Sequence, residues 1–314
     1  MTTADPAPLV PPAFAAWTVA REGDAGRAWI ERLPRLVAKA CRRWRLVVDG
    51  PSTHGHVALV VPVRTPDGTP AVLKVSWVQA ETEHETMALR AWGGDAAVGV
   101  LAATADEGWA DPDRTLLLER LGDRTLLDVA DHEEATALAA ERLGRLHVPP
   151  PDGLRTLAAI AARWVDELPA EWDRSGRALP RRLLDAALAT CRDLGPDHRA
   201  VLLHGDFHYE NVLAGSRAPW LVIDPKPVAG DPGFDLVALL WNRWEELVAT
   251  GDAASAVRRR LDLAAEVAGI DRDRKRRWSV VRAVDNELWG LLTGPPDDDW
   301  TGGAERTIAE ALAE

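Results

Sequence analysis

The sequence predicts an α+β fold in two lobes, a small antiparallel-sheet lobe followed by a larger, mostly helical lobe. Three observations predict it. Short apolar runs separated by turn residues dominate the first part of the chain. Beyond this part, apolar residues recur at helical spacing over long stretches. Short strand-like runs interrupt the helical pattern between residues 201 and 223. We expect an N-terminal lobe at 1–119, with a flexible tail at 1–12, and a C-terminal lobe at 120–314.

The N-terminal lobe is expected to open with a helix over 24–44, where Trp29, Leu33 and Val37 follow helical spacing. Asp24 would cap this helix, and Pro34 would kink it. The later elements of this lobe, in chain order, are strands at 46–49, 57–63 and 71–75, a helix at 81–92, and strands at 98–103 and 115–119.

The C-terminal lobe is expected to be helical on both sides of the strand-like runs. Its predicted helices span 126–147, 154–168, 180–194, 234–250, 253–268, 271–292 and 301–312. Between them, the apolar runs at 201–203, 212–213 and 220–223 are short enough to be buried strands. Polar residues follow these strands, so they are expected to gather at neighbouring strand ends.

Composition limits the classes of partner. The chain has 314 residues and a net charge of −12, which argues against a nucleic-acid partner and is compatible with a cationic substrate or with solubility alone. It contains no apolar run long enough to span a membrane, and its N-terminus lacks the pattern of a secretory signal. The two cysteines, Cys41 and Cys191, fit buried thiols in the cytoplasm. The sequence leaves the oligomeric state open.

Three polar residues have the spacing that phosphoryl transfer requires. Asn211 lies five residues after Asp206, and Asp224 lies eighteen residues after it. A kinase needs a carboxylate that orients the attacking hydroxyl, then an amide five residues on that reaches Mg²⁺. It also needs a second carboxylate on the next hairpin, and both oxygen groups suit a hard cation. We therefore expect Asp206 to be catalytic, and Asn211 and Asp224 to bind Mg²⁺.

The sequence motifs around these residues resemble those of one family. The segments HGDFHYEN and IDPKPVAGDPGFDL are similar to those of the aminoglycoside phosphotransferases, a branch of the protein-kinase-like fold, and most similar to the streptomycin and hydroxyurea phosphotransferase group. The resemblance covers about residues 46–290. It implies a bilobal kinase-like fold, ATP or GTP as donor with Mg²⁺, and a hydroxyl of a small molecule as acceptor. The preferred acceptor is a cationic aminoglycoside, with streptomycin first and antibiotic resistance as the role.

Lys74 lies in an apolar strand that resembles the kinase strand whose lysine contacts the α- and β-phosphates and pairs with a helix glutamate. Three carboxylates open the following helix, at Glu81, Glu83 and Glu85. Glu85 shares a helix face with apolar residues three and four positions on, so we expect it to be the partner of Lys74. The alternative for these glutamates is a solvated first helical turn.

The other nucleotide contacts rest on weaker patterns. The loop over 49–56 has two glycines rather than the glycine-rich kinase pattern, and it would offer phosphate donors from Ser52 and Thr53. By the resemblance, the strand that ends near Glu119 is the hinge between the lobes. The Glu119 carbonyl and the Leu121 amide would then contact the purine edge. An ordinary hairpin turn and an ordinary inter-lobe strand explain the same sequences.

Supporting residues, Lys226 and a set of acceptor residues complete the predicted site. His204, Asp231 and Asp235 are expected to support the catalytic loop without touching substrate, Asp231 as a helix cap. Lys226 either touches phosphate or is a solvated loop residue. The acceptor is expected to meet acids and tryptophans of the C-terminal lobe, because these suit a sugar that bears cations. These candidates are Glu210, Trp241, Glu245, Asp285, Glu287 and Trp289.

Three alternatives remain at the level of sequence. The acceptor could be hydroxyurea or another small metabolite. The chain could be a catalytically silent kinase-like binding module, although silent forms usually lose one of Lys74, Asp206, Asn211 and Asp224. Finally, His204, Asp206 and His208 alternate as His-x-Asp-x-His, a pattern that could bind zinc if the segment were extended.

Overall fold

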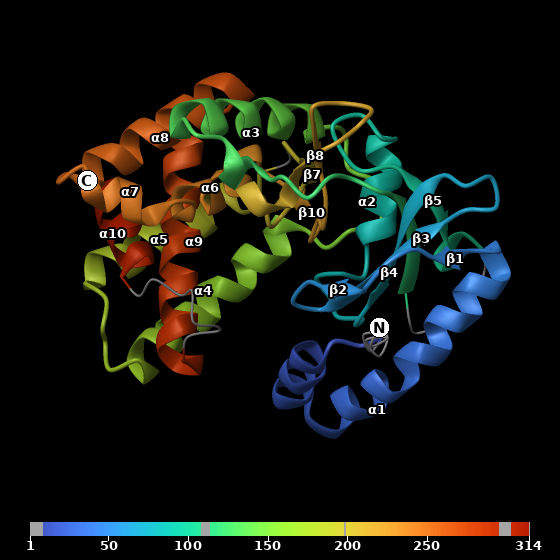
Figure 1. Ribbon diagram of the computed structural model, residues 1–314. Helices are drawn as coiled ribbons and strands as arrows, with labels where there is room; N and C mark the ends of the chain where they lie inside the picture. Colours follow the sequence, from blue (N-terminus) through green and yellow to red (C-terminus); the bar gives the residue numbers. More distant parts are fainter. Residues whose placement is uncertain (1–8, 108–113, 198, 295–302, 314) are drawn as a thin grey trace. The chain divides into compact units, whose positions relative to one another are not determined.

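A computed structural model describes residues 9–107, 114–197, 199–294 and 303–313. The chain divides into two compact units (Figure 1). The first unit comprises Met1–Gly94 and Val98–Leu121, and the second comprises Asp95–Ala97 and Gly122–Glu314. Most of the predicted tail, residues 1–8, lies outside the described residues, and a helix already begins at Pro12.

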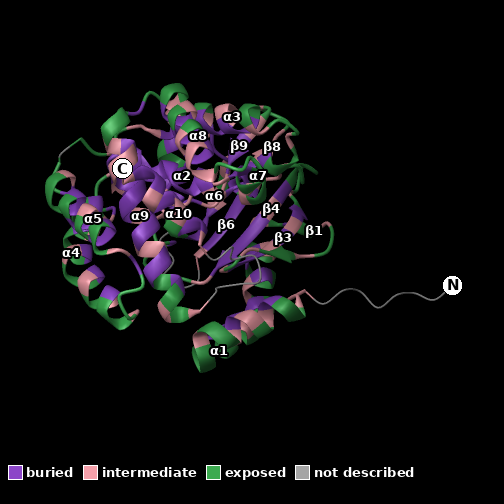
Figure 2. Cartoon of the chain, turned by 90° about the vertical axis from the view of Figure 1, so that its left-hand side faces the viewer, coloured by how far each residue is buried: buried purple, intermediate pink, exposed green. Residues whose placement is uncertain are grey.

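The first unit contains an antiparallel sheet with the strand order β1-β3-β4-β6-β5, and β2 pairs with β3 off this path. The strands are β1 (Val47–Val48), β2 (Thr53–His54), β3 (Ala58–Arg64), β4 (Pro70–Ser76), β5 (Val100–Ala103) and β6 (Arg114–Glu119). Strand β4 lies between β3 and β6, and most of its residues are buried (Figure 2). The predicted strands are all present, and β2 is an addition inside the loop expected at 49–56.

Helix α1 (Pro12–Trp44) is longer than the sequence predicted. Gly23 adopts a left-handed φ of 61° and breaks the helix just before Asp24, whereas the helix continues through Pro34. The break separates two helical segments, so their apolar residues do not form one periodic stripe, and the first segment was missed. Leu33 is fully buried and belongs to the same hydrophobic core as the residues of β3 and β4.

Helix α2 (Glu85–Trp92) begins four residues later than predicted. The hydroxyl of Thr82 donates to the carbonyls of Trp77 and Gln79, which holds the preceding residues in turns. Serine and threonine side chains that bond to nearby backbone compete with helix formation in this way. Glu85 is therefore the first residue of α2, and Glu81 and Glu83 precede the helix.

The second unit is mostly helical. Its longer helices are α3 (His132–Leu146), α4 (Leu157–Arg174), α5 (Arg181–Leu194), α8 (Ala253–Ala268), α9 (Arg272–Thr293) and α10 (Ala304–Leu312). Two predicted helices are divided. A 3-10 turn η2 (Leu126–Asp128) precedes α3, and the predicted helix at 234–250 consists of η4 (Pro232–Leu236), α6 (Ala238–Trp241) and α7 (Trp244–Ala249). Arg243, with a φ of 54°, separates α6 from α7. Residues 301 and 302 of the last predicted helix lie outside the described residues.

Two small antiparallel ribbons interrupt these helices. Strand β7 (Val201–Leu203) pairs with β10 (Val228–Gly230), and β8 (Val212–Ala214) pairs with β9 (Trp220–Val222). The loops that leave β7 and β9 carry the polar residues of the predicted catalytic site. In the described part of the chain, no helix combines the length and the apolar character that crossing a bilayer requires.

Candidate catalytic site

The second unit brings the segments of Asp206, Asn211 and Asp224 together. Asp206 follows β7, Asn211 ends the 3-10 turn η3 (Tyr209–Asn211), and Asp224 follows β9. The side-chain amide of Asn211 donates to the Asp206 carbonyl at 2.9 Å. The backbone carbonyl of Asn211 accepts from the N–H of Ile223 at 2.9 Å. These two hydrogen bonds connect the loop after β7 to the residue that precedes Asp224.

Asp235 holds the start of the candidate catalytic loop, residues 204–211. Its carboxylate, 3% exposed, accepts the backbone N–H of His204 at 2.8 Å and that of Gly205 at 2.7 Å. The His204 ring bonds the carbonyl of Ile223 through Nε2 at 2.9 Å, and its Nδ1 accepts the N–H of Asp206 at 3.2 Å. Burial lowers the pKa of His204, which favours the neutral ring that this bonding requires.

The loop after β7 is in close backbone contact with the loop after β9. Lys226 donates its backbone N–H to the His204 carbonyl at 2.8 Å. Gly205 has a φ of 80°, and a Cβ there would lie 2.1 Å from the Lys226 carbonyl oxygen, so only glycine fits. Asp224 adopts a left-handed φ of 58°, which is uncommon for a residue with a side chain. Such conformations are retained where the surroundings fix them, often at functional sites.

Lys226 also reaches Asp206 with its side chain. Its Nζ lies 2.9 Å from the Oδ2 of Asp206. Burial alone would raise the pKa of Asp206, but the Lys226 ammonium, with His208, outweighs it and lowers the pKa to about 2. Asp206 is therefore a carboxylate at neutral pH. It is a weak base, suited to orienting a hydroxyl and to accepting its proton late in the reaction.

The amide of Asn211 has a defined orientation. Its Nδ2 donates to the Asp206 carbonyl and lies 3.0 Å from the Nε2 of His208. Because the nitrogen is engaged on this side, the amide oxygen is the atom that remains to bind a cation. The other ring nitrogen of His208, Nδ1, lies 3.4 Å from a carboxylate oxygen of Glu210, whose side chain is largely exposed. His208 thus orients Asn211, a role that the sequence left unassigned.

The geometry does not suit the zinc alternative. Both ring nitrogens of His204 bond to backbone groups, so this side chain has no nitrogen to offer a metal without losing those bonds. Within the described ranges, no group of three or more histidine, cysteine, aspartate or glutamate side chains could hold a metal ion. Gly205 also turns the chain, which removes the extended geometry that the alternation needed.

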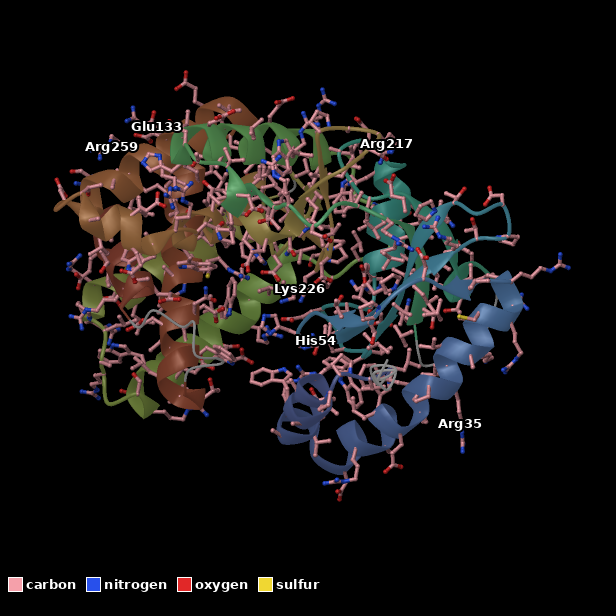
Figure 3. All side chains as sticks on the ribbon, in the orientation of Figure 1. Arg35, His54, Glu133, Arg217, Lys226 and Arg259 are labelled. Atoms are coloured by element: carbon pink, nitrogen blue, oxygen red, sulfur yellow. The ribbon has the colours of Figure 1, made fainter. Side chains whose placement is uncertain are left out.

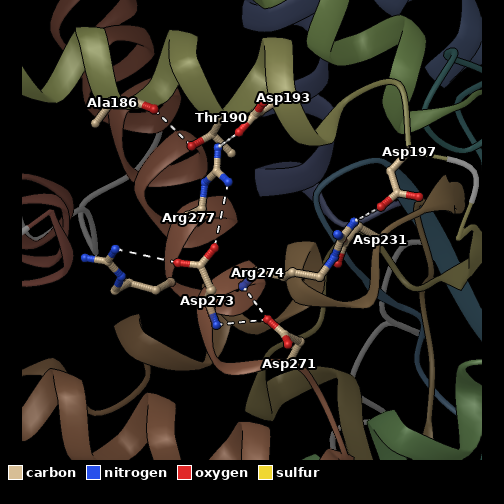
Figure 4. Close-up of polar contacts among 10 residues, drawn as sticks. Ala186, Thr190, Asp193, Asp197, Asp231, Asp271, Asp273, Arg274 and Arg277 are labelled. Carbon is tan, nitrogen blue, oxygen red and sulfur yellow. Dashed lines mark hydrogen bonds and ion pairs between the residues drawn. The ribbon is translucent and has the colours of Figure 1, made fainter.

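Asp231 is a structural residue at the start of η4. Its carboxylate accepts the N–H of Gly233 at 2.8 Å and forms an ion pair with Arg274 of α9 (Figure 4). Arg274 also reaches Asp197, at 2.8 Å. Asp231 therefore ties the segment that carries Asp235 to α9.

Lys74 and Glu85 form a buried ion pair in the first unit. The Nζ of Lys74, on β4, lies 2.6 Å from Oε1 of Glu85, the first residue of α2. The residues are 6% and 3% exposed. Buried pairs contribute little net stability because desolvation offsets their attraction, so a functional reason for the pair is expected. Glu85 is the glutamate that was predicted to pair with Lys74, and its role towards nucleotide stays a prediction.

The loop over 49–56 is held by α1 and by the residues just before it. The hydroxyl of Ser52 donates to the carbonyl of Leu9, and the ring of His54 stacks on Phe14 with centroids 5.0 Å apart. The Ser52 hydroxyl is thus engaged within the protein, whereas Thr53 is exposed on β2. At the predicted hinge, β6 ends at Glu119, whose side chain accepts the N–H of Gly99 at 2.7 Å. Leu121 closes the first unit.

The predicted acceptor residues fall into different environments. Glu245 on α7 and Trp289 on α9 are exposed, Trp289 by 50%. Burial raises the pKa of Asp285 to about 6, although Arg282 opposes this. Burial likewise raises the pKa of Glu287, and Glu305 adds to it. Trp241, on α6, is partly buried. Their role towards an acceptor stays a prediction.

Sequence reasoning missed residues that fix the loop from outside it. Arg155 donates to the carbonyls of Lys226, at 3.0 Å, and Pro227, at 3.2 Å. The side chain of Asn242 accepts the N–H of Tyr209 at 2.9 Å. One arginine among many carries no local signal, and Asn242 lies 33 residues from its partner. A pattern read along the chain could not have found either contact.

Comparison with known proteins identifies the family. A model of the aminoglycoside/hydroxyurea antibiotic resistance kinase family matches residues 43–294. Streptomycin 6-kinase from Streptomyces griseus is 44% identical over 93% of both chains. Hydroxyurea phosphotransferase from Kitasatospora aureofaciens is 42% identical over 87% of this chain and 77% of the relative. The chain belongs to the aminoglycoside/hydroxyurea antibiotic resistance kinase family, as its motifs had indicated.

Solved structures confirm the predicted kinase-like fold. A thermostable mutant of aminoglycoside phosphotransferase APH(4)-Ia, in a ternary complex with AMP-PNP and hygromycin B, matches with a TM-score of 0.60 at 18% identity. The match covers 87% of this chain and 97% of that one. Spectinomycin phosphotransferase APH(9)-Ia, in complex with ADP and spectinomycin, matches with a TM-score of 0.52 at 12% identity over 85% and 92% of the two chains. At this identity the likeness concerns the fold alone.

We predict that Asp235→Ala lowers the free energy of unfolding by about 2–5 kcal/mol, because it leaves two buried backbone N–H groups without their charged acceptor. Urea denaturation followed by tryptophan fluorescence measures it. Asp166→Ala, at an exposed position on α4, is the matched control and should change stability by less than about 0.5 kcal/mol. Equal stabilities of the two variants would contradict the assigned role of Asp235.

Proposed function

We propose that this member of the aminoglycoside/hydroxyurea antibiotic resistance kinase family transfers the γ-phosphoryl group of ATP to the 6-hydroxyl of streptomycin. The observation that carries the proposal is the catalytic loop, in which Asp206, Asn211 and the segment of Asp224 are joined by hydrogen bonds. Relatives named streptomycin 6-kinase, at 44% and 42% identity over nearly the whole chain, support the acceptor. The product would no longer act as the antibiotic, so resistance is the expected role.

The nucleotide is assigned to three sets of groups. Lys74, held by Glu85, suits the α- and β-phosphates, because a buried and paired lysine presents its charge in a fixed position. The backbone at Glu119 and Leu121 suits the purine edge, and the loop over 49–56, where Thr53 is exposed, suits the phosphates. Complexes of fold relatives with AMP-PNP and with ADP support a nucleotide donor. ATP is preferred here, and GTP is the alternative.

Asn211 and Asp224 fit Mg²⁺. Magnesium is usually held by one or two protein oxygen groups together with substrate phosphates, rather than by a protein cage. The amide nitrogen of Asn211 is engaged by the Asp206 carbonyl and His208, which leaves its oxygen as a ligand. The strained backbone at Asp224 is a further sign of a functional position. When bound, Mg²⁺ would neutralise charge on the phosphates.

Asp206 would orient the acceptor. Its carboxylate accepts a hydrogen bond from the acceptor hydroxyl, which directs the hydroxyl oxygen at the γ-phosphorus. As the new O–P bond forms, the bond to the β–γ bridging oxygen breaks and its electrons leave with ADP. The hydroxyl proton passes to Asp206 late in this step, consistent with a pKa of about 2. Positioning and charge neutralisation supply most of the catalysis of phosphoryl transfer.

The acceptor site is the finer part of the proposal. Streptomycin is cationic, and the chain has a net charge of −12 with acidic candidates at Glu210, Glu245, Asp285 and Glu287. Hydroxyurea is the second candidate, because a hydroxyurea phosphotransferase is 42% identical to this chain. A silent binding module is disfavoured by the intact set of catalytic residues.

We place the reaction in the cytoplasm, where ATP is abundant and where free thiols such as Cys41 and Cys191 persist.

Asp206→Asn keeps the size of the side chain and removes its charge. We predict that kcat falls by about 10²-fold or more, the scale of a lost general base, while the affinity for Mg-ATP stays near that of the wild type. Steady-state kinetics with streptomycin and calorimetric titration of the nucleotide measure the two quantities. Near-normal kcat in a folded variant would remove Asp206 from this role.

Asp224→Ala removes a proposed ligand of Mg²⁺. We predict that nucleotide binding loses its dependence on Mg²⁺, because the remaining amide oxygen of Asn211 carries no charge. Titration calorimetry with ATP, in the presence of Mg²⁺ and in the presence of EDTA, measures the difference. If the variant kept the Mg²⁺ dependence of the wild type, the metal ligands would have to lie elsewhere.

The acceptor is tested by mass spectrometry. Incubation of the purified protein with Mg-ATP and streptomycin should add one phosphoryl group to the drug and release one ADP per drug molecule. Fragmentation should locate the group at the 6-hydroxyl, and cells that express the protein should tolerate streptomycin. A mass gain by hydroxyurea but none by streptomycin would replace the acceptor and retain the kinase assignment.

A further inference from the structure

Lys226 is placed beside the proposed catalytic carboxylate by two independent parts of the molecule. It lies in the loop between β9 and β10 of the second unit (Figure 3). Its backbone N–H donates a hydrogen bond to the His204 carbonyl, and its backbone carbonyl accepts one from the guanidinium group of Arg155. Gly205 lies so close to the Lys226 carbonyl that no Cβ fits between them. The Cα of Lys226 is thus fixed relative to Asp206, whatever the side chain does.

The side chain then makes a defined contact. Its Nζ lies 2.9 Å from Oδ2 of Asp206, and the two side chains are 33% and 27% exposed. An ion pair that solvent reaches to this extent usually contributes little to net stability. Stability alone therefore gives little reason for the pair. Partial exposure also means that a substrate can approach both groups.

The presence of a lysine at position 226 also indicates a functional role. Only four of the 37 basic residues are lysines, so arginine is the default cation of this chain. Lys74 and Lys275 are buried and paired with Glu85 and Asp262. A lysine carries a compact charge with three donors, which can contact a carboxylate and a phosphate oxygen at once. The planar guanidinium of arginine is suited to two-point contact with a single anion instead.

The proposed reaction needs such a cation. Asp206 must receive the acceptor close to a triphosphate, and two anionic groups at short distance repel each other. An ammonium group between them reduces the repulsion. It also stabilises the charge on the phosphoryl oxygens of the transition state, where fixed charges are most effective.

We propose that Lys226 is a catalytic residue whose ammonium group bridges the carboxylate of Asp206 and the phosphoryl group in transfer. This inference rests on the proposed function. In the step, the acceptor oxygen bonds to the γ-phosphorus, the bond to the bridging oxygen breaks, and ADP leaves with its electrons. The hydroxyl proton passes to Asp206. Lys226 donates hydrogen bonds throughout and keeps its own protons.

Lys226→Met tests this role, because methionine keeps the chain length and removes the charge. We predict that kcat falls by about 10²- to 10³-fold, the cost of losing one donor to a transition-state anion. The KM for ATP should stay near that of the wild type, because the contact matters mainly in the transition state. Lys226→Arg should recover part of the activity. Lys39→Met, at an exposed position on α1, is the matched control and should leave kcat unchanged.

A second readout separates catalysis from support of the loop. The slow hydrolysis of Mg-ATP without acceptor requires stabilisation of the phosphoryl group and does not require orientation of an acceptor hydroxyl. Lys226→Met should therefore lower this hydrolysis and the transfer to streptomycin alike, whereas Asp206→Asn should affect the transfer more. An unchanged kcat in Lys226→Met, a loss that matches a lower fraction of folded protein, or a loss confined to the transfer would overturn the proposal.

The outcomes also distinguish this inference from the proposed function. If the wild type does not phosphorylate streptomycin but hydrolyses Mg-ATP, the acceptor is wrong and Lys226 is judged by the hydrolysis alone. If Lys226→Met retains full activity while Asp206→Asn loses it, the kinase assignment stands and the role of Lys226 is wrong. A wild type that neither hydrolyses ATP nor phosphorylates any acceptor overturns both.

Discussion

The buried carboxylate of Asp235 fixes the backbone from which the catalytic loop starts, and the other features of the site depend on it. It accepts the N–H groups of His204 and Gly205, which lie at the end of β7. With these groups satisfied, the His204 ring can bond the carbonyl of Ile223 and the N–H of Asp206. Each contact satisfies a buried polar group that would otherwise cost free energy, so the loop has one favourable conformation. A preorganised loop of this kind is what positioning catalysis needs.

The same hydrogen bonds also fix the positions of the charged and polar side chains of the site. Asp206 stays ionised because Lys226 lies beside it, and Lys226 stays there because its backbone is bonded to the loop. His208 sets the orientation of the Asn211 amide, so a neutral side chain presents its oxygen in a defined direction. Buried Lys74 and Glu85 follow the same principle in the first unit, where each charged side chain is held in place by the other. In each case a charged or polar group is held by the protein before any substrate binds, which reduces reorganisation during the reaction.

Family membership and acceptor choice rest on different observations. The family rests on the loop motifs and on similarity across residues 43–294. The residues proposed to bind the acceptor range from exposed Trp289 to buried Glu287. Relatives of similar identity carry the names of a large cationic drug and of a small neutral molecule.

The sequence by itself predicted the candidate catalytic residues and most of the order of the elements, because both patterns are local. The spacing of Asp206, Asn211 and Asp224 reflects one loop and one hairpin, and apolar periodicity marks most of the helices and strands. Only the tertiary structure decided where helices end and what supports the loop. The first half of α1 and the start of α2 depend on a left-handed Gly23 and on the hydroxyl bonds of Thr82. The hydrogen bonds and the ion pair made by Arg155, Asn242 and Lys226 join residues that are distant in the chain. Neither periodicity nor spacing predicts which distant polar groups will need a partner.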